Sequence, residues 1–249
     1  MGRADLHIHT REGDGLDSVQ AIFDHVEAET DLDVIAITEH DHLETALRAR
    51  EAWARGRYRF DFVPGVEITT LEGHVVALYL QEPVASLRRV EETIEAVRRQ
   101  GGVCFAPHPT SWLTRSIGAG TFGRLLARRG EGLWFDGIEL ASASPAGRFY
   151  IDRARRLNDE SWALPVVGAS DAHFVEAIGS AYTQFDGSSA ADLRSAFAGG
   201  AVSGQRRRFP SLRRVGPGRL LGVAVAGLGA TPRRLGWRRT AWSFVSRYL

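Results

Sequence analysis

The chain has 249 residues, of which 44% are hydrophobic and 24% charged, a composition typical of one large α/β domain. Its single cysteine, Cys104, excludes an intrachain disulfide, and no apolar run reaches the roughly 18 residues of a membrane-spanning helix. The net charge of +1 excludes a uniformly basic or uniformly acidic protein, although the charge is unevenly distributed along the chain.

Strand-like and helix-like patterns alternate along most of the chain. Apolar stretches predict strands over residues 4–8, 33–38, 61–69, 73–80, 103–107, 137–142, 165–170 and 180–185. Amphipathic stretches predict helices over residues 17–29, 43–55, 87–100, 122–129, 148–157 and 190–198. This alternation favours the α/β class with a mostly parallel barrel or sheet, although the segments 61–69 and 73–80 resemble a strand pair.

Six of the eight histidines stand at, or just past, the ends of these strands, each close to an acid or another histidine. In α/β barrels the catalytic groups lie where strands end and loops begin. Imidazole and carboxylate together are the ligands of catalytic transition-metal sites. The pattern therefore indicates a metallohydrolase, with the candidate ligands His7, His9, His40, His74, His108 and His173.

The first candidates lie in the segment DLHIHT. Strand alternation places Asp5, His7 and His9 on one face, so that two imidazoles can point at a shared ion. An incidental His-x-His pair is the alternative. Asp14 follows in the turn-forming segment GDG, either as a further ligand or as an ordinary turn residue.

The segments TEHD and GVE contribute the next candidates. His40 ends a strand between Glu39 and Asp41. Because Asp41 and Glu44 fit a capping box, we expect Asp41 to cap the helix that follows. We expect Glu39 to support a ligand or to be solvated. Glu67 ends an apolar strand and could pair with an arginine, but a carboxylate that bridges two metals is the sharper hypothesis.

The later candidates lie at three further strand boundaries. His74 begins strand 73–80, and His108 stands between two prolines that fix its backbone. In the segment GASDAH, Asp171 and His173 share a face if the backbone is extended, so both can reach one cluster. Helix N-capping by Ser170 or Asp171 is the alternative.

Taken together, these motifs resemble the PHP family, named for polymerase and histidinol phosphatase domains. The chain shows HIH, GDG, TEHD, GVE, GH, HP and DAH in the family's order, over about residues 4–205. The resemblance implies a distorted (β/α)7 TIM-like barrel with a metal cluster at the C-terminal ends of the strands. It also implies a stand-alone PHP protein, because the chain has no polymerase module.

The resemblance further implies two or three divalent ions and their ligands. One ion would take His7, His9, Glu67 and Asp171. A second ion would take Glu67, His74 and His108. A third ion would take Asp14, His40 and His173. Since no cysteine is among these ligands, manganese, iron and zinc are all suitable metals.

Two residues depart from the family pattern without removing a ligand. Gly13 stands where a serine commonly precedes Asp-Gly, and we expect this change to be tolerated. Glu39 stands in place of an aspartate and is one methylene longer, which is expected to shift the geometry around the ligands.

The expected activity is metal-dependent hydrolysis of a small phosphomonoester or nucleotide-type phosphate ester. Two ions would lower the pKa of a shared water, and the resulting hydroxide would attack phosphorus in line. The expected catalytic residues are Glu67, Asp171 and His173, and either Asp171 or a metal-bound water would protonate the leaving group. Arg115 and Arg148, on loops of the expected catalytic face, are candidates for binding the substrate phosphate.

Two other functions stay open. Barrel metallohydrolases with similar ligands also hydrolyse non-phosphate esters or amides. A catalytically inert metal-binding module is the other alternative, although every ligand is present. Measurements of activity against phosphate and carboxylic esters would separate these hypotheses.

The charge distribution predicts two parts, the PHP barrel over residues 1–205 and a basic tail over residues 206–249. The barrel contains 20 arginines and all 30 acidic residues, whereas the tail contains 11 arginines and no acid. The tail is expected to lie along the acidic barrel or to be solvated, with nucleic acid or anionic lipid as alternative partners. Ligands from residue 7 onward leave no room for a signal peptide, so a cytoplasmic location is expected.

Overall fold

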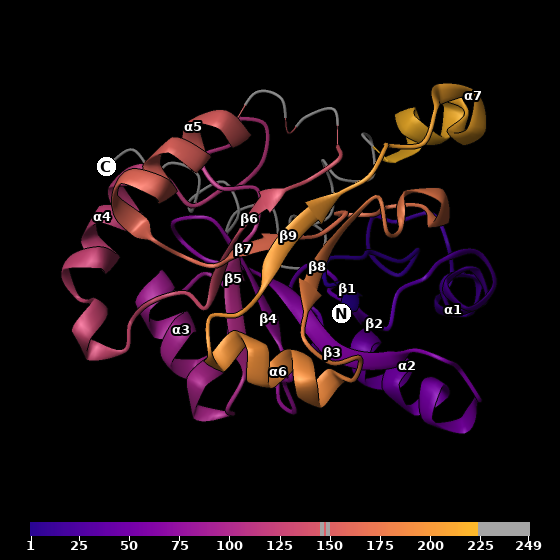
Figure 1. Cartoon of the computed structure of the whole chain (residues 1–249), viewed down its shortest axis with the longest axis horizontal. Coiled ribbons are helices and arrows are strands. Elements are labelled where there is room, and N and C mark those ends of the chain that lie inside the picture. Colours follow the sequence, from indigo (N-terminus) through magenta and orange to yellow (C-terminus); the bar gives the residue numbers. More distant parts are fainter. Residues whose placement is uncertain (145–146, 148–149, 224–249) are drawn as a thin grey trace.

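The computed structural model describes residues 1–144, 147 and 150–223, and Figure 1 shows their arrangement. The strands are β1 (Gly2–Asp5), β2 (Val34–Ile37), β3 (Asp61–Thr69), β4 (His74–Leu78), β5 (Val103–Ala106), β6 (Gly137–Ala141), β7 (Val166–Gly168), β8 (Ala181–Phe185) and β9 (Ser203–Arg206). The helices are α1 (Val19–Glu29), α2 (Leu43–Arg55), α3 (Val90–Arg99), α4 (Ala119–Ala127), α5 (Ile151–Leu157), α6 (Ala190–Ala198) and α7 (Leu212–Val215). All strands and helices expected from the sequence are present, and β9 and α7 are additional.

In the described residues the strands form one nine-stranded sheet, in the order β7-β6-β5-β4-β3-β2-β1-β8-β9. Strands β1 to β3 are parallel to one another, as are β5 to β7. Strand β4 is antiparallel to β3 and β5, and β8 is antiparallel to β1 and β9. The α/β barrel is confirmed, but its sheet is mixed. The short connection between β3 and β4 cannot hold the crossover that parallel strands need.

Close backbone contact between β7 and the β8–β9 pair nearly closes this sheet into a barrel. The Thr183 hydroxyl accepts a hydrogen bond from the Gly168 N–H at 3.2 Å and donates one to the Gly168 carbonyl at 2.8 Å. A Cβ atom at Gly168 would lie 2.2 Å from the Tyr182 carbonyl oxygen. A Cβ atom at Gly204 would lie 2.8 Å from the Val167 carbonyl carbon. Closure therefore depends on two residues without side chains.

Helices α1 to α6 lie around the outside of the strands (Figure 1). Helix α1 shows the pattern, because it buries Ile22, Phe23 and Val26 in a cluster that includes residues of β2 and β3. The Ser18 hydroxyl caps this helix by accepting a hydrogen bond from the Ala21 N–H. Amphipathic helices thus bury the outer side of the sheet, and Cys104 is buried there as expected.

The described beginning of the tail packs against the barrel. Val215 is buried, and Phe209, Leu220 and Val223 are partly buried against the cluster that contains Ile8. Strand β9 continues the sheet as far as Arg206, across the expected division between barrel and tail. Residues 224–249, the rest of the tail, lie outside the described residues.

Arginine also joins the tail to the acidic body. The Arg219 guanidinium pairs with the Asp17 carboxylate at 2.8 Å and with the Glu176 carboxylate at 2.9 Å. Over the part of the chain that the structure describes, no helix is long and apolar enough to cross a membrane.

Candidate metal centre

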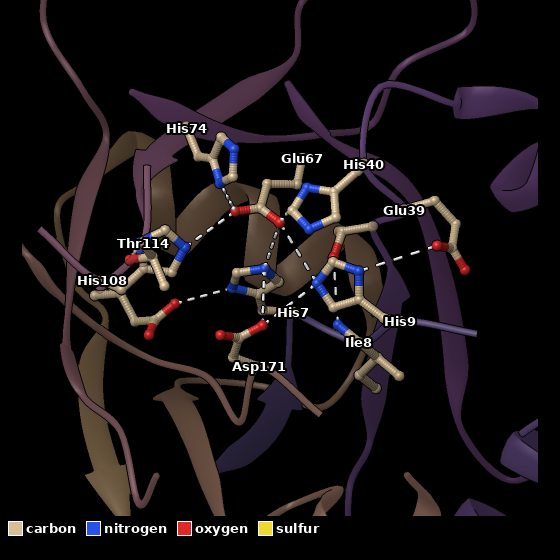
Figure 2. A network of polar contacts seen from close by, with 12 residues as sticks. His7, Ile8, His9, Glu39, His40, Glu67, His74, His108, Thr114 and Asp171 are labelled. Atoms are coloured by element: carbon tan, nitrogen blue, oxygen red, sulfur yellow. Dashed lines mark hydrogen bonds and ion pairs between the residues drawn. The ribbon is translucent and has the colours of Figure 1, made fainter. Parts of the chain in front are cut away.

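The expected ligands meet at the end of the barrel where β1, β2, β3 and β7 finish (Figure 2). The backbone of Ile8 bridges to Ala172, and that of His40 bridges to Glu67. The first bridge joins the segments that follow β1 and β7, and the second joins the segment that follows β2 to Glu67 within β3. Because the strands are parallel there, their carboxyl ends open at the same face, as the sequence predicts.

The Glu67 carboxylate lies at the centre of the cluster and is fully buried. Its Oε1 atom lies 2.8 Å from His74 Nδ1 and 3.0 Å from His108 Nε2. Its Oε2 atom lies 3.3 Å from His7 Nε2 and 3.4 Å from His9 Nε2. The Oε2 atom also lies 3.1 Å from His40 Nδ1. The two oxygens thus face different imidazoles, two on one side and three on the other, as a carboxylate bridging two cations requires.

Asp171 completes the ligand set formed by His7, His9 and Glu67. Its Oδ1 atom lies 3.4 Å from His7 Nε2 and 3.3 Å from His9 Nε2. Each of the two nitrogens is therefore 3.3 or 3.4 Å from an oxygen of both carboxylates. Ligand atoms around a tetrahedral ion with bonds of about 2.0 Å are roughly 3.3 Å apart. The spacing of this set fits a first-row transition-metal ion.

The second set consists of Glu67, His74 and His108, whose ligand atoms lie within 4.8 Å of one another. The other ring nitrogen of His108 lies 2.9 Å from the Ser116 hydroxyl and 3.1 Å from the Thr114 hydroxyl. These contacts fix the ring orientation and leave Nε2 facing Glu67. Groups that hold the far nitrogen of a ligating histidine in this way increase metal affinity.

The third set surrounds Asp14. Its Oδ2 atom lies 3.2 Å from His173 Nε2 and 3.6 Å from His40 Nε2. The His173 Nδ1 atom lies 2.9 Å from the Asp171 carbonyl, which can only accept a hydrogen bond, so Nδ1 carries the proton. Nε2 of His173 is then the nitrogen available to a cation. His9 also lies within 4.8 Å of Asp14 and His173.

Several buried polar atoms of the cluster have no hydrogen-bond partner among the described residues. They are His7 Nε2, both ring nitrogens of His9, Asp14 Oδ1, His40 Nδ1, Glu67 Oε2 and both ring nitrogens of His74. Each buried polar group left without a partner costs about 1–3 kcal/mol. Divalent cations would satisfy these nitrogen and oxygen atoms together. The residues present therefore fit the metals expected from the sequence.

The charges of the cluster depend on one another. Burial by itself would raise the pKa of Glu67, but the charges of His40, His74 and His7 hold it well below its usual range. Burial lowers the pKa of His40, but Glu67 and Asp14 outweigh it and raise the value to about 10. Burial and the charge of His173 lower the pKa of His9 to about 4. Cations would replace the protons that otherwise balance these carboxylates.

One buried group was missed by the sequence interpretation. Glu139 of β6 is buried, and its Oε2 atom lies 3.1 Å from His7 Nδ1. This contact directs the opposite nitrogen of His7 at Glu67 and Asp171, in the carboxylate–histidine–metal arrangement. The available signal was a lone acid inside the apolar strand sequence GIELA, which is costly to bury unless it is paired.

The expectation that Asp41 caps α2 is wrong. Asp41 has a φ of 55°, and its carboxylate accepts hydrogen bonds from the Thr69 N–H, the Thr69 hydroxyl and the Ser86 hydroxyl. The residue in the N-cap position of α2 is His42, without a side-chain cap. Asp41 therefore ties the end of β3 to the segment before α3, which holds the strand end near Glu67.

Asp171 reaches the cluster by a different backbone route from the one expected. Its φ is 52°, so the segment that carries Asp171 and His173 is not extended. His108 also has a positive φ, of 31°. Non-glycine residues in this region cost free energy, and such strain is concentrated at functional sites. The side chains of Asp171 and His108 nevertheless face the cluster as predicted.

The two departures from the family pattern, Gly13 and Glu39, meet in the structure. One Glu39 carboxylate oxygen accepts hydrogen bonds from the Thr10 N–H, at 2.6 Å, and from the Thr10 hydroxyl. Its other oxygen is buried and would lie 1.9 Å from a Cβ atom at position 13. The longer acid therefore occupies the space that a side chain at position 13 would need. Because Asp14 follows Gly13, this contact positions a candidate ligand.

Gly13→Ser and Glu39→Asp are expected to be strongly non-additive. Each change alone should destabilise the protein, since the serine displaces Glu39 and the aspartate withdraws the carboxylate from Thr10. In the double variant the shorter acid should make room for the serine, giving a coupling energy of at least about 1 kcal/mol. Chemical denaturation of all four proteins measures this energy. Additivity to within about 0.5 kcal/mol would contradict the coupling.

The two arginines expected to bind phosphate differ in what the structure describes. Arg115 lies beside the second ligand set, because its backbone carbonyl accepts a hydrogen bond from the His74 N–H at 2.8 Å. Its guanidinium donates to the Thr70 carbonyl at 3.4 Å. Arg148 lies outside the described residues.

Comparisons with known proteins agree with the family resemblance. The model of the PHP-associated family matches residues 152–202. The uncharacterised protein MJ1587 of Methanocaldococcus jannaschii is 30% identical over 152 residues, which are 57% of this chain and 82% of that protein. The crystal structure of a two-domain protein from Bacteroides vulgatus, containing a predicted PHP-like metal-dependent phosphoesterase, has a TM-score of 0.65 to this chain. The chain belongs to the PHP superfamily.

The extent of these PHP matches differs. The Bacteroides vulgatus structure is 21% identical in sequence, and the match covers 82% of this chain and 64% of that one. The 5'-3' exoribonuclease Rnm of Escherichia coli is 37% identical over 78 residues, 30% of this chain and 26% of that enzyme. The fold is thus shared over most of the chain, whereas the family model matches residues 152–202 and the match to the exoribonuclease is local.

Proposed function

We propose that this PHP protein is a metal-dependent hydrolase of phosphate esters with two or three ions of manganese, iron or zinc. The observation that carries this proposal is the buried Glu67 carboxylate, whose two oxygens face separate groups of imidazoles. The proposed ligands are His7, His9, Asp14, His40, Glu67, His74, His108, Asp171 and His173. The similarity to a protein described as containing a PHP-like metal-dependent phosphoesterase supports phosphorus chemistry.

Differences in exposure indicate the side from which substrate would reach the cluster. The side chain of Asp171 is 27% exposed, whereas those of Glu67 and His7 are fully buried. His173 and His40 are also partly exposed. We therefore assign substrate contact to the side of Asp171 and His173, and a supporting role to Glu67.

Bound ions would supply electrostatic stabilisation of phosphoryl oxygens and an activated water. The protein residues would keep the spacing between the ions fixed. Glu67 joins two ligand sets through one rigid carboxylate, and Glu139 and Ser116 hold the rings of His7 and His108. The exposed carboxylate of Asp171 would orient the water or take part in proton transfer to the leaving group. Arg115, next to the second set, would contact a substrate phosphate oxygen.

The test is reconstitution of chelator-treated protein with Mn²⁺, Fe²⁺ or Zn²⁺, followed by metal analysis and ester assays. We expect about two or three ions per chain and at least a 100-fold stimulation of p-nitrophenyl phosphate hydrolysis by one metal. The matched control is Glu51→Gln, which alters an exposed carboxylate of α2 outside the cluster. That variant should keep its metal content and rate.

Other substrates separate the alternatives. Faster metal-dependent hydrolysis of p-nitrophenyl acetate or an anilide than of any phosphate ester would favour the ester or amide hydrolase. Tight metal binding without hydrolysis of any substrate would favour the inert metal-binding module. Release of nucleotides from a 5'-phosphorylated RNA oligomer, at a rate above that of p-nitrophenyl phosphate, would favour an exoribonuclease like the local relative.

A further inference from the structure

A cavity of about 420 Å³ lies between the connection from β6 to α5 and the end of β9. Its volume is within the range of small-molecule sites, about 300–1,000 Å³. The described residues that line it include Ser142, Ser144, Ile151, Asp152, Arg206 and Arg207. None of them belongs to the proposed metal ligands.

The cavity lies on the same face of the barrel as the metal cluster. Ser142 follows β6, the strand whose Glu139 contacts His7. Arg206 pairs in register with Ala181 at the start of β8. Because β8 is antiparallel to β1, the start of β8 and the end of β9 lie at the end of the barrel where β1 leads into His7. Both walls of the cavity therefore reach the catalytic face.

Tyr150 links the cavity to the cluster. Its buried side chain is hydrogen-bonded to Ser142. Burial, together with the charges of Glu139 and Asp171, raises the pKa of the Tyr150 hydroxyl above its usual range. The Tyr150 phenol is thus hydrogen-bonded to a residue of the cavity wall and lies near enough to Glu139 and Asp171 for their charges to act on it. Asp171 also has the most exposed side chain of the proposed metal ligands.

The two arginines of the cavity wall differ in whether they have a charged partner. Arg207 pairs with the Asp31 carboxylate at 2.7 Å, which also pairs with Arg3, so the Arg207 guanidinium is already engaged. Arg206 is exposed and has no charged partner among the described residues. Ser142 and Ser144 line the same cavity. The wall therefore offers a guanidinium and hydroxyls, which suit a polar group carrying a negative charge.

We propose that this cavity binds the leaving group of the phosphate ester, and that Arg206 pairs with an anionic substituent on that group. The inference rests on the proposed phosphoesterase function and adds a substrate class to it. The preferred substrates would be hydroxyl-bearing phosphate esters with a carboxylate or a second phosphate. Asp152, at the start of α5, would accept hydrogen bonds from their hydroxyl groups.

The experiment compares esters that differ mainly in the anionic substituent. Substrate pairs are 3-phosphoglycerate with glycerol 1-phosphate, for a carboxylate, and fructose 1,6-bisphosphate with fructose 6-phosphate, for a phosphate. In at least one pair, we expect the metal-loaded protein to have a higher kcat/KM for the ester that carries the additional carboxylate or phosphate. Arg206→Gln should lower kcat/KM for the ester with the additional anionic group, and so reduce the preference by at least about 10-fold. Ser144→Asp should have the same effect through repulsion.

The control is Arg208→Gln, which changes an exposed arginine that is two residues away and outside the cavity lining. It should keep the preference, which separates a local effect from the general charge of the tail. An equal kcat/KM for both members of both pairs, or an unchanged preference in Arg206→Gln, would overturn this inference while phosphatase activity persists. Loss of metal-dependent hydrolysis for every ester in the unmodified protein would instead overturn the proposed function.

Discussion

Glu67→Gln is expected to lower phosphate ester hydrolysis by at least about 1,000-fold and to reduce the metal content of the protein. The carboxylate faces His74 and His108 with one oxygen. It faces His7, His9 and His40 with the other. A glutamine keeps the shape but turns one of these oxygens into an NH₂ group, which cannot bind a cation. At least one ligand set would then lose its anionic member, and two-ion catalysis would fail.

Metal analysis and steady-state kinetics on the same preparation check this prediction. Thermal unfolding with and without metal adds a third measurement, because a ligand at about 1,000 times its Kd stabilises the native state by about 4 kcal/mol. Unmodified protein should gain thermal stability on metal addition, and Glu67→Gln should gain much less. Retention of full metal content and a rate within about 10-fold would remove Glu67 from the centre of the site.

Gly168→Ala is expected to destabilise the protein by about 3 kcal/mol, even though only one methyl group is added. The new Cβ atom would lie 2.2 Å from the Tyr182 carbonyl oxygen and 2.8 Å from the Gln205 nitrogen. Both are backbone atoms, so the clash can be relieved only by moving β8 and β9 away from β7. That movement would also disturb the hydrogen bonds between Thr183 and Gly168.

Gly123→Ala in α4 is the matched control, because a Cβ atom there meets nothing within 4 Å. Alanine favours a helix over glycine by about 1 kcal/mol, so this variant should be slightly more stable than the unmodified protein. Chemical denaturation of metal-free protein measures both changes without a contribution from metal binding. Equal stabilities for the two variants would show that the edge strands do not need the close approach at Gly168.

Local sequence patterns were sufficient to predict the class of the fold and the residue types that meet at the candidate metal centre. Period-two and helical patterns located the expected elements, because each depends on neighbours only a few residues away. Metal chemistry limits the ligands to a few residue types, so histidines and acids at successive strand ends could be recognised as one set. The PHP motifs supplied their order, and the strand ends supplied the reason for their meeting at one face.

Tertiary structure alone decided the contacts that join distant segments. Glu139 and His7 are 132 residues apart, and their contact depends on the register of the strands around the barrel. The contact between Gly13 and Glu39, and the turning of Asp41 toward Thr69 instead of α2, depend on the same packing. A local pattern carries no information about which partner lies across the barrel. Side-chain direction and spacing between strands are fixed only when the sheet closes.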